Sequence, residues 1–251
     1  MEVFATGQEN PHDLTFDPSG SLLVSETDAD RVSRIEVLPD GTAGGISTVA
    51  SGIDDAEGLV LDTSGNLFVS DSDTVFKVAD GTATVFASGF NDAEGLAIDQ
   101  LGDLFVADDI AEGIRISRVD TFVDDSAGDV STFAIIPTGS TAADIEFDTT
   151  GALFVADNKD AVWKIAIGLD GPAAEISPFV GGLNLPFALE FDSLGNLFVG
   201  CTSGDIWRID SDGNVNLFAT GFASADGLAF DTQGNLFVSE FWERRIIKIR
   251  R

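Results

Sequence analysis

Short apolar runs recur along this chain at a constant spacing. In DGLAFDTQGNLFVSE, residues 226–240, two apolar runs flank the motif D-x-x-G, and related stretches begin at residues 12, 57, 94, 143 and 187. The aspartate of the motif therefore occurs six times, at residues 17, 62, 99, 148, 192 and 231. The period of about 43 residues is typical of a solenoid, a propeller or an array of small units.

Each repeat predicts a meander of four antiparallel strands. D-x-x-G is typical of a type I turn, with Asp at the first position and Gly at the fourth, so the two apolar runs form a β-hairpin. Two further runs follow, as in RVSRIEV at 31–37 and TVASG at 48–52. No segment carries a sustained helical period, and the fold is therefore predicted to be all-β.

The second strand of each unit indicates how the units pack together. NLFVS and its relatives are apolar on consecutive residues, which predicts that both faces of the strand are covered and that the units stack as blades. The last unit ends at its third strand, RRIIKIR at 244–250, whereas the chain begins with EVFATG at 2–7, which matches a fourth strand. We predict one domain over residues 1–251, a six-bladed β-propeller with four antiparallel strands per blade, whose N-terminal strand completes the last blade.

The aromatic composition supports dry interfaces between blades. The chain has 20 Phe and no Tyr, whose phenol group would need a hydrogen-bond partner in such an interface. We assign the phenylalanines of the second strands to the scaffold: Phe68, Phe105, Phe154, Phe198 and Phe237. The six turn aspartates are likewise expected to accept bonds from backbone amides rather than to bind a ligand.

One face of the predicted propeller collects the positions at which the copies differ. The start of the first strand and the end of the second lie on this face, and the D-x-x-G turn lies on the other. The first-strand position holds, in chain order, His12, Glu57, Glu94, Ala143, Phe187 and Asp226. The end of the second strand supplies a possible second arc of carboxylates: Glu26, Asp71, Asp108, Asp157 and Glu240.

Crowded carboxylates at the rim need something that offsets their repulsion. Two like charges 4 Å apart cost about 4 kcal/mol at an effective dielectric constant near 20. Separation in solvent, a raised pKa or a bound cation would each relieve this cost, and the sequence leaves all three open. For the case of a bound cation, we predict a divalent ion held by Glu57, Glu94 and Asp226. Oxygen ligands favour calcium, with magnesium or manganese as alternatives.

The same rim holds the candidates for catalysis. His12 is the sole histidine, and its position beside the acids makes it a candidate general acid or base, although a lone histidine is also common in turns and cores. The predicted catalytic group is His12, Glu57 and Asp226. Phe187, Cys201 and Trp242 are predicted to form the apolar wall of a pocket.

The charge of the chain limits its partners. Thirteen Lys and Arg against 43 Asp and Glu give a net charge of -30, which repels phosphate backbones and makes nucleic acid an unsuitable partner. No apolar run approaches the roughly 18 residues of a membrane helix, so we expect a soluble monomer without a membrane partner. The chain opens without a basic and then apolar leader, which slightly favours a mature secreted or periplasmic form. The compartment stays open, because the single cysteine forms no internal disulfide.

The repeat resembles the NHL and six-bladed calcium-dependent phosphotriesterase-like propellers over the whole chain. This group includes the senescence-marker-protein/gluconolactonase family and virginiamycin B lyase. In the gluconolactonase family, E-G and D-G motifs four blades apart supply metal ligands, and AEGL with Glu57 and ADGL with Asp226 resemble them. The family's asparagine ligands would fall at Ala143 and Phe187, so Asp144 or Glu94 would have to substitute.

Three functions follow from these patterns. The resemblance and the acidic rim favour a metal-dependent hydrolase of lactones or esters, with a small-molecule substrate. The alternative is a noncatalytic NHL-type scaffold that binds a protein, a sugar or ions. A virginiamycin-B-lyase-like lyase, suggested by PHDLTFDPSGSLLVSETDADRVSRI at 11–35, is less favoured because such a lyase is expected to use more than one histidine. Whether the protein is an enzyme stays open at this point.

Overall fold

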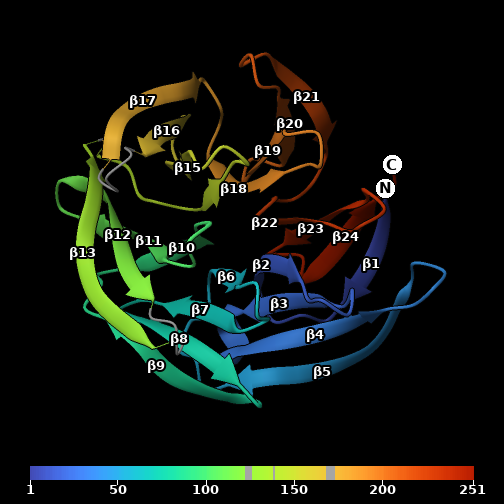
Figure 1. Ribbon diagram of the computed structural model, residues 1–251. Helices are drawn as coiled ribbons and strands as arrows, with labels where there is room; N and C mark the ends of the chain where they lie inside the picture. The colour runs from blue at the N-terminus through green and yellow to red at the C-terminus, as the bar shows by residue number, and fades with distance from the viewer. Residues whose placement is uncertain (122–125, 138, 168–172) are drawn as a thin grey trace.

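The structure is a closed ring of six β-sheets, each with four antiparallel strands (Figure 1). The computed structural model describes residues 1–121, 126–137, 139–167 and 173–251. The first three blades comprise β2 (Pro11–Phe16), β3 (Leu22–Glu26), β4 (Arg31–Val37) and β5 (Ala43–Ser51); β6 (Leu59–Leu61), β7 (Leu67–Asp71), β8 (Thr74–Ala79) and β9 (Thr82–Ser88); and β10 (Ala93–Ile98), β11 (Leu104–Ile110), β12 (Gly113–Thr121) and β13 (Ala127–Ile136).

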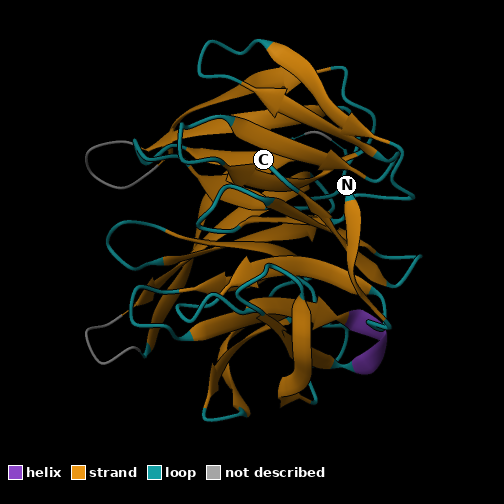
Figure 2. Ribbon diagram, turned by 90° about the vertical axis from the view of Figure 1, so that its right-hand side faces the viewer, coloured by secondary structure: helices purple, strands orange, loops and turns teal. Residues whose placement is uncertain are grey.

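The other three blades repeat the same order of strands. They comprise β14 (Ile145–Phe147), β15 (Leu153–Ala156), β16 (Ala161–Ile167) and β17 (Ala173–Gly181); β18 (Pro186–Phe191), β19 (Leu197–Cys201), β20 (Asp205–Ile209) and β21 (Val215–Thr220); and β22 (Gly227–Phe230), β23 (Leu236–Glu240) and β24 (Arg245–Ile249) with β1 (Glu2–Thr6). In the side view of Figure 2, strands make up almost the whole molecule, and the helix among the described residues is the single turn η1 (Thr27–Ala29).

The N-terminal strand closes the ring, as the sequence predicted. β1 pairs antiparallel with β24, in a register that joins Glu2 to Lys248 and Thr6 to Arg245. The sixth blade therefore takes three strands from the end of the chain and one from its beginning. This pairing covers the edge of β24 and gives the sixth blade its fourth strand, which confirms both the six-bladed architecture and the contribution of the N-terminal strand to the last blade.

The turn aspartates have the scaffold role that the repeat indicated. In the first blade, the Oδ1 of Asp17 accepts bonds from the amides of Ser19 at 2.8 Å and Ser21 at 3.1 Å. The same two bonds, to the amides two and four residues further on, occur at the other five turns, which start at Asp62, Asp99, Asp148, Asp192 and Asp231. The Oδ1 atoms of these six aspartates therefore stabilise the turns by accepting backbone hydrogen bonds.

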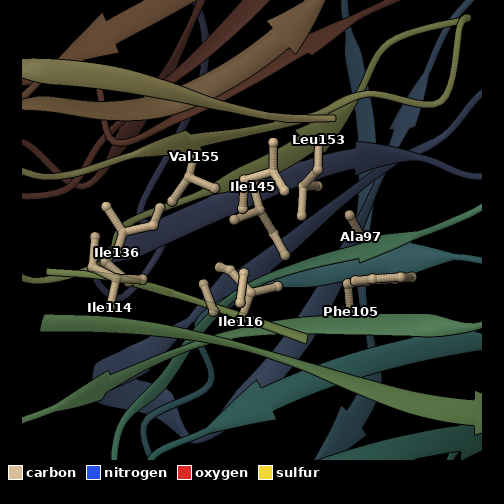
Figure 3. Packing of buried hydrophobic residues seen from close by; sticks show 12 residues of the cluster. Ala97, Phe105, Ile114, Ile116, Ile136, Ile145, Leu153 and Val155 are labelled. Atoms are coloured by element: carbon tan, nitrogen blue, oxygen red, sulfur yellow. The ribbon is translucent and has the colours of Figure 1, made fainter. Parts of the chain in front are cut away.

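Phenylalanine rings fill the interfaces between blades. Phe105 on β11 meets Phe133 of its own blade and Phe147 of the next blade edge to face, with both centroid distances at 5.1 Å. Around it, Figure 3 shows Ile116 and Ile145 facing each other across the interface of the third and fourth blades. Equivalent triplets centre on Phe154, Phe198 and Phe237. Phenylalanine packing of the kind predicted from the composition is therefore present at these four interfaces.

Among the described residues, no helix has the length and apolarity needed to cross a bilayer.

Candidate functional site

The first strand of each blade lies nearest the axis of the ring, as β6, β10, β18 and β22 show in Figure 1. Neighbouring first strands approach so closely that a side chain would not fit between them. A Cβ atom on Gly58 would lie 2.3 Å from the carbonyl oxygen of Glu94, and one on Gly227 would lie 2.3 Å from that of His12. Glycine at these positions is therefore required by backbone contact between blades.

This close packing brings together one polar side chain from each of the first three blades. His12, Glu57 and Glu94 each offer a ligand atom, and these three atoms lie within 4.8 Å of one another. Nδ1 of His12 and the Oε2 atoms of Glu57 and Glu94 are buried and have no hydrogen-bond partner. Buried polar atoms without partners cost free energy, and a cation bound by these three residues would offset that cost. The donor set thus fits a divalent metal ion.

Burial sets the protonation of this cluster. Burial lowers the pKa of His12 to about 4, so its imidazole is neutral at pH 7 and has a free lone pair. Burial, reinforced by Asp55 and other nearby carboxylates, raises the pKa of Glu57 to about 8. Burial and the adjacent Glu57 raise the pKa of Glu94 well above its usual value. Without a cation, the two glutamates therefore tend to hold protons at neutral pH.

Asp226 lines a small cavity of about 10 Å³ together with His12, Glu94 and Phe187. Its Oδ2 accepts bonds from the hydroxyl of Ser224 and, at 3.0 Å, from the amide of Phe241. Burial raises the pKa of Asp226. Of the residues predicted as ligands, Glu57 and Glu94 thus lie next to His12, whereas Asp226 is oriented by a separate set of hydrogen bonds.

The predicted apolar wall is only partly assembled in the structure. The ring of Phe187 packs edge-on against His12 at 5.1 Å. Cys201, by contrast, is buried in the core between the fourth and fifth blades, where burial raises its pKa to about 12. Trp242 is 74% exposed and packs on Phe241 rather than lining the cavity.

The second arc of carboxylates is engaged in local bonds. Three of its members pair with an arginine on the adjacent third strand: Glu26 with Arg31, Asp108 with Arg115, and Glu240 with Arg245. The other two accept bonds from backbone amides: Asp71 from Asp73, and Asp157 from Lys159, Asp160 and Ala161. These partners fix the connections between second and third strands, in contrast to the unpartnered atoms of the rim.

A second group of acids lies along the innermost strands, and of its members only Asp144 was noted from the sequence. Asp13 accepts a bond from the amide of Leu59 in the next blade at 2.7 Å, and Glu190 accepts one from Phe230 at 3.0 Å. Burial raises the pKa of Asp13 to about 7 and that of Glu190 to about 8. Asp144 and Glu146 belong to the same group, and burial and the neighbouring acids raise their pKa values as well. The alternation of these acids with apolar residues on the first strands was the available signal.

Comparison with solved structures identifies the fold. The gluconolactonase XC5397 from Xanthomonas campestris superposes with a TM-score of 0.83 at 14% identity, over 98% of this chain and 87% of that one. Virginiamycin B lyase from Staphylococcus aureus superposes with a TM-score of 0.69 at 16% identity, over 100% of this chain and 87% of that one. An auxiliary nutrient binding protein from Bacteroides thetaiotaomicron superposes with a TM-score of 0.79 at 14% identity, over 96% of this chain and 69% of that one.

Sequence comparison adds nothing to this result, since no family model and no curated protein matches the chain. The names of the three structural relatives state three different functions, so the structural likeness shows a shared fold and not a shared function. The chain therefore has the six-bladed propeller fold of the gluconolactonase-like proteins.

Proposed function

We propose that the protein is a metal-dependent hydrolase of lactones or esters, with a divalent cation held by His12, Glu57 and Glu94. Two observations carry this proposal: His12, Glu57 and Glu94, from three different blades, each offer a ligand atom within 4.8 Å of the others, and each has a buried polar atom without a hydrogen-bond partner. The likeness to a gluconolactonase supports the hydrolase class. A cation bound there would polarise the carbonyl of an ester or lactone.

The imidazole of His12 in the ligand set changes which ion is expected at the site. Calcium, which the sequence favoured, prefers six to eight oxygen ligands. Zinc accepts imidazole and carboxylate together, and manganese accepts carboxylates readily. We therefore rank manganese and zinc ahead of calcium for a site made of His12, Glu57 and Glu94.

Asp226 is the proposed proton acceptor for the attacking water. Its raised pKa brings the carboxyl closer to the pH at which a general base works best. The bonds from Ser224 and from the amide of Phe241 both reach Oδ2, so they orient the carboxyl group within the cavity. The ring of Phe187 lines the same cavity and packs edge-on against His12.

A noncatalytic ion-binding scaffold is the second candidate. It is favoured by the small volume of the cavity, about 10 Å³, which is far below the roughly 300 Å³ of typical ligand pockets. The likeness to an auxiliary nutrient binding protein also supports a binding role. A lyase reaction has weaker support, because His12 is the only histidine in the chain.

A panel of lactones and aryl esters, assayed with manganese, zinc, calcium and magnesium, separates the two candidates. The hydrolase proposal predicts activity that EDTA abolishes and that Asp226→Asn lowers at least about 100-fold without loss of the metal. Asp210→Asn, in a turn between β20 and β21, is the matched control and keeps full activity. Metal binding without turnover of any ester would favour the ion-binding scaffold.

A further inference from the structure

Three serines connect the candidate ligands to the preceding blade. The hydroxyl of Ser25 on β3 donates to the carbonyl oxygen of Glu57 at 2.5 Å. The hydroxyl of Ser70 on β7 donates to that of Glu94 at 2.6 Å. The hydroxyl of Ser239 on β23 donates to that of His12 at 2.6 Å. Each bond thus crosses a blade interface and ends on the main chain of a proposed ligand.

Two of these hydroxyls also accept a bond within their own blade. The amide of Asp13 donates to the hydroxyl of Ser25 at 2.9 Å, and the amide of Gly58 donates to that of Ser70 at 2.8 Å. One hydroxyl therefore links the first strands of two neighbouring blades. All three serines are fully buried, so water does not compete for these bonds.

The distribution of the serines follows the ligands rather than the repeat. The equivalent second-strand positions in the third, fourth and fifth blades are Ala107, Ala156 and Gly200. The rim residues that follow them in the next blades are Ala143, Phe187 and Asp226, none of which belongs to the cluster of three. A bond needed only for blade packing would be expected in all six blades.

We propose that Ser25, Ser70 and Ser239 are positioning residues of the metal centre. This inference rests on the proposed function, because it takes His12, Glu57 and Glu94 as ligands. By holding the three main-chain carbonyls, the hydroxyls fix where the ligand side chains start. Groups that orient ligands in this way typically contribute 10- to 100-fold to metal affinity.

The first test compares manganese affinity among single variants by titration calorimetry. Ser25→Ala, Ser70→Ala and Ser239→Ala are each expected to bind manganese 10- to 100-fold more weakly than the wild type. Ser117→Ala is the matched control, because Ser117 is equally buried but lies on the third strand β12. Affinities of the three variants within twofold of the control would overturn the proposal.

The second test requires no metal, so it separates failure of this inference from failure of the proposed function. His12 is the only histidine, and its imidazole therefore gives one assignable NMR signal. In the metal-free protein, Ser239→Ala is expected to shift or broaden this signal, whereas Ser117→Ala leaves it unchanged. If the signal is the same in both variants, Ser239 does not position His12. If the wild type binds no ion, the proposed metal centre is refuted. If the His12 signal nevertheless responds to Ser239→Ala, the conclusion that Ser239 positions His12 still stands.

Discussion

Ser239 and His12 lie 227 residues apart in the chain, yet the hydroxyl of Ser239 donates a 2.6 Å hydrogen bond to the carbonyl oxygen of His12. This bond spans the last and the first blade, at the interface next to the strand exchange between β1 and β24. The blade that closes the ring therefore also holds the main chain of His12.

Gly227→Ala should damage that interface directly. The added Cβ would lie 2.3 Å from the carbonyl oxygen of His12, so the first and last blades must move apart. We expect the free energy of unfolding to fall by about 1 to 3 kcal/mol, as for overpacked cores, together with weaker metal binding. Chemical denaturation and titration calorimetry measure the two effects.

Gly181→Ala is the control for this substitution, because a Cβ on Gly181 meets no atom within 4 Å. Equal stability of the two variants would contradict the close approach between blades.

Phe105→Ala should leave a cavity between the third and fourth blades. The ring is 1% exposed and packs against Phe133 and Phe147, so its removal is expected to cost about 3 to 5 kcal/mol of stability. Leu101→Ala, at a side chain that is 83% exposed, is expected to have almost no effect. Thermal unfolding with an unchanged midpoint for Phe105→Ala would show that this interface is not tightly packed.

The repeat predicted the architecture because a scaffold position must satisfy the same packing in every blade. Phe105 and Phe237 face equivalent interfaces, and Asp17 and Asp231 make equivalent turns, so their periodicity alone reveals their roles.

The site was less predictable, because it depends on which blades become neighbours and on what each carboxylate meets. Glu94 and Glu240 are both acids on one predicted rim, but Glu240 pairs with Arg245 whereas Oε2 of Glu94 has no partner. A single sequence does not distinguish these two environments. The role of Ser239 was hidden for a similar reason, since its acceptor, His12, lies at the other end of the chain.

The buried acid Glu190 should make stability depend on pH. Folding raises its pKa from 4.5 to about 8 through burial, so between these values the folded protein holds a proton that the unfolded chain has released. Its contribution to stability is therefore present below about pH 4.5 and is lost as the pH rises to about 8. Glu190→Gln removes this loss and keeps an oxygen for the amide of Phe230.

We expect Glu190→Gln to exceed the wild type in stability at pH 9, by about 1.4 kcal/mol for each unit of pKa shift, and to match it near pH 4. Urea denaturation at both pH values provides the measurement. Glu243→Gln, at an exposed position, serves as the control and should show no such difference. An equal effect of Glu190→Gln at both pH values would argue against a buried protonated carboxyl.

Metal affinity should rise with pH. The pKa of Glu57 is about 8, so a cation must displace its proton at lower pH, whereas His12, with a pKa of about 4, is already neutral. We expect affinity for manganese to increase up to about tenfold per pH unit for each displaced proton between pH 6 and pH 8. Calorimetry in buffers of different ionisation enthalpy counts the released protons, and an affinity independent of pH in this range would rule out protonated ligands.

The most direct test of the metal centre is a crystal structure of the protein grown with manganese, with anomalous diffraction used to locate the ion. The account predicts one anomalous peak in contact with the side chains of His12, Glu57 and Glu94, and its loss in Glu94→Gln. A map without a peak at this position, or with the ion bound only among other surface acids, would contradict it.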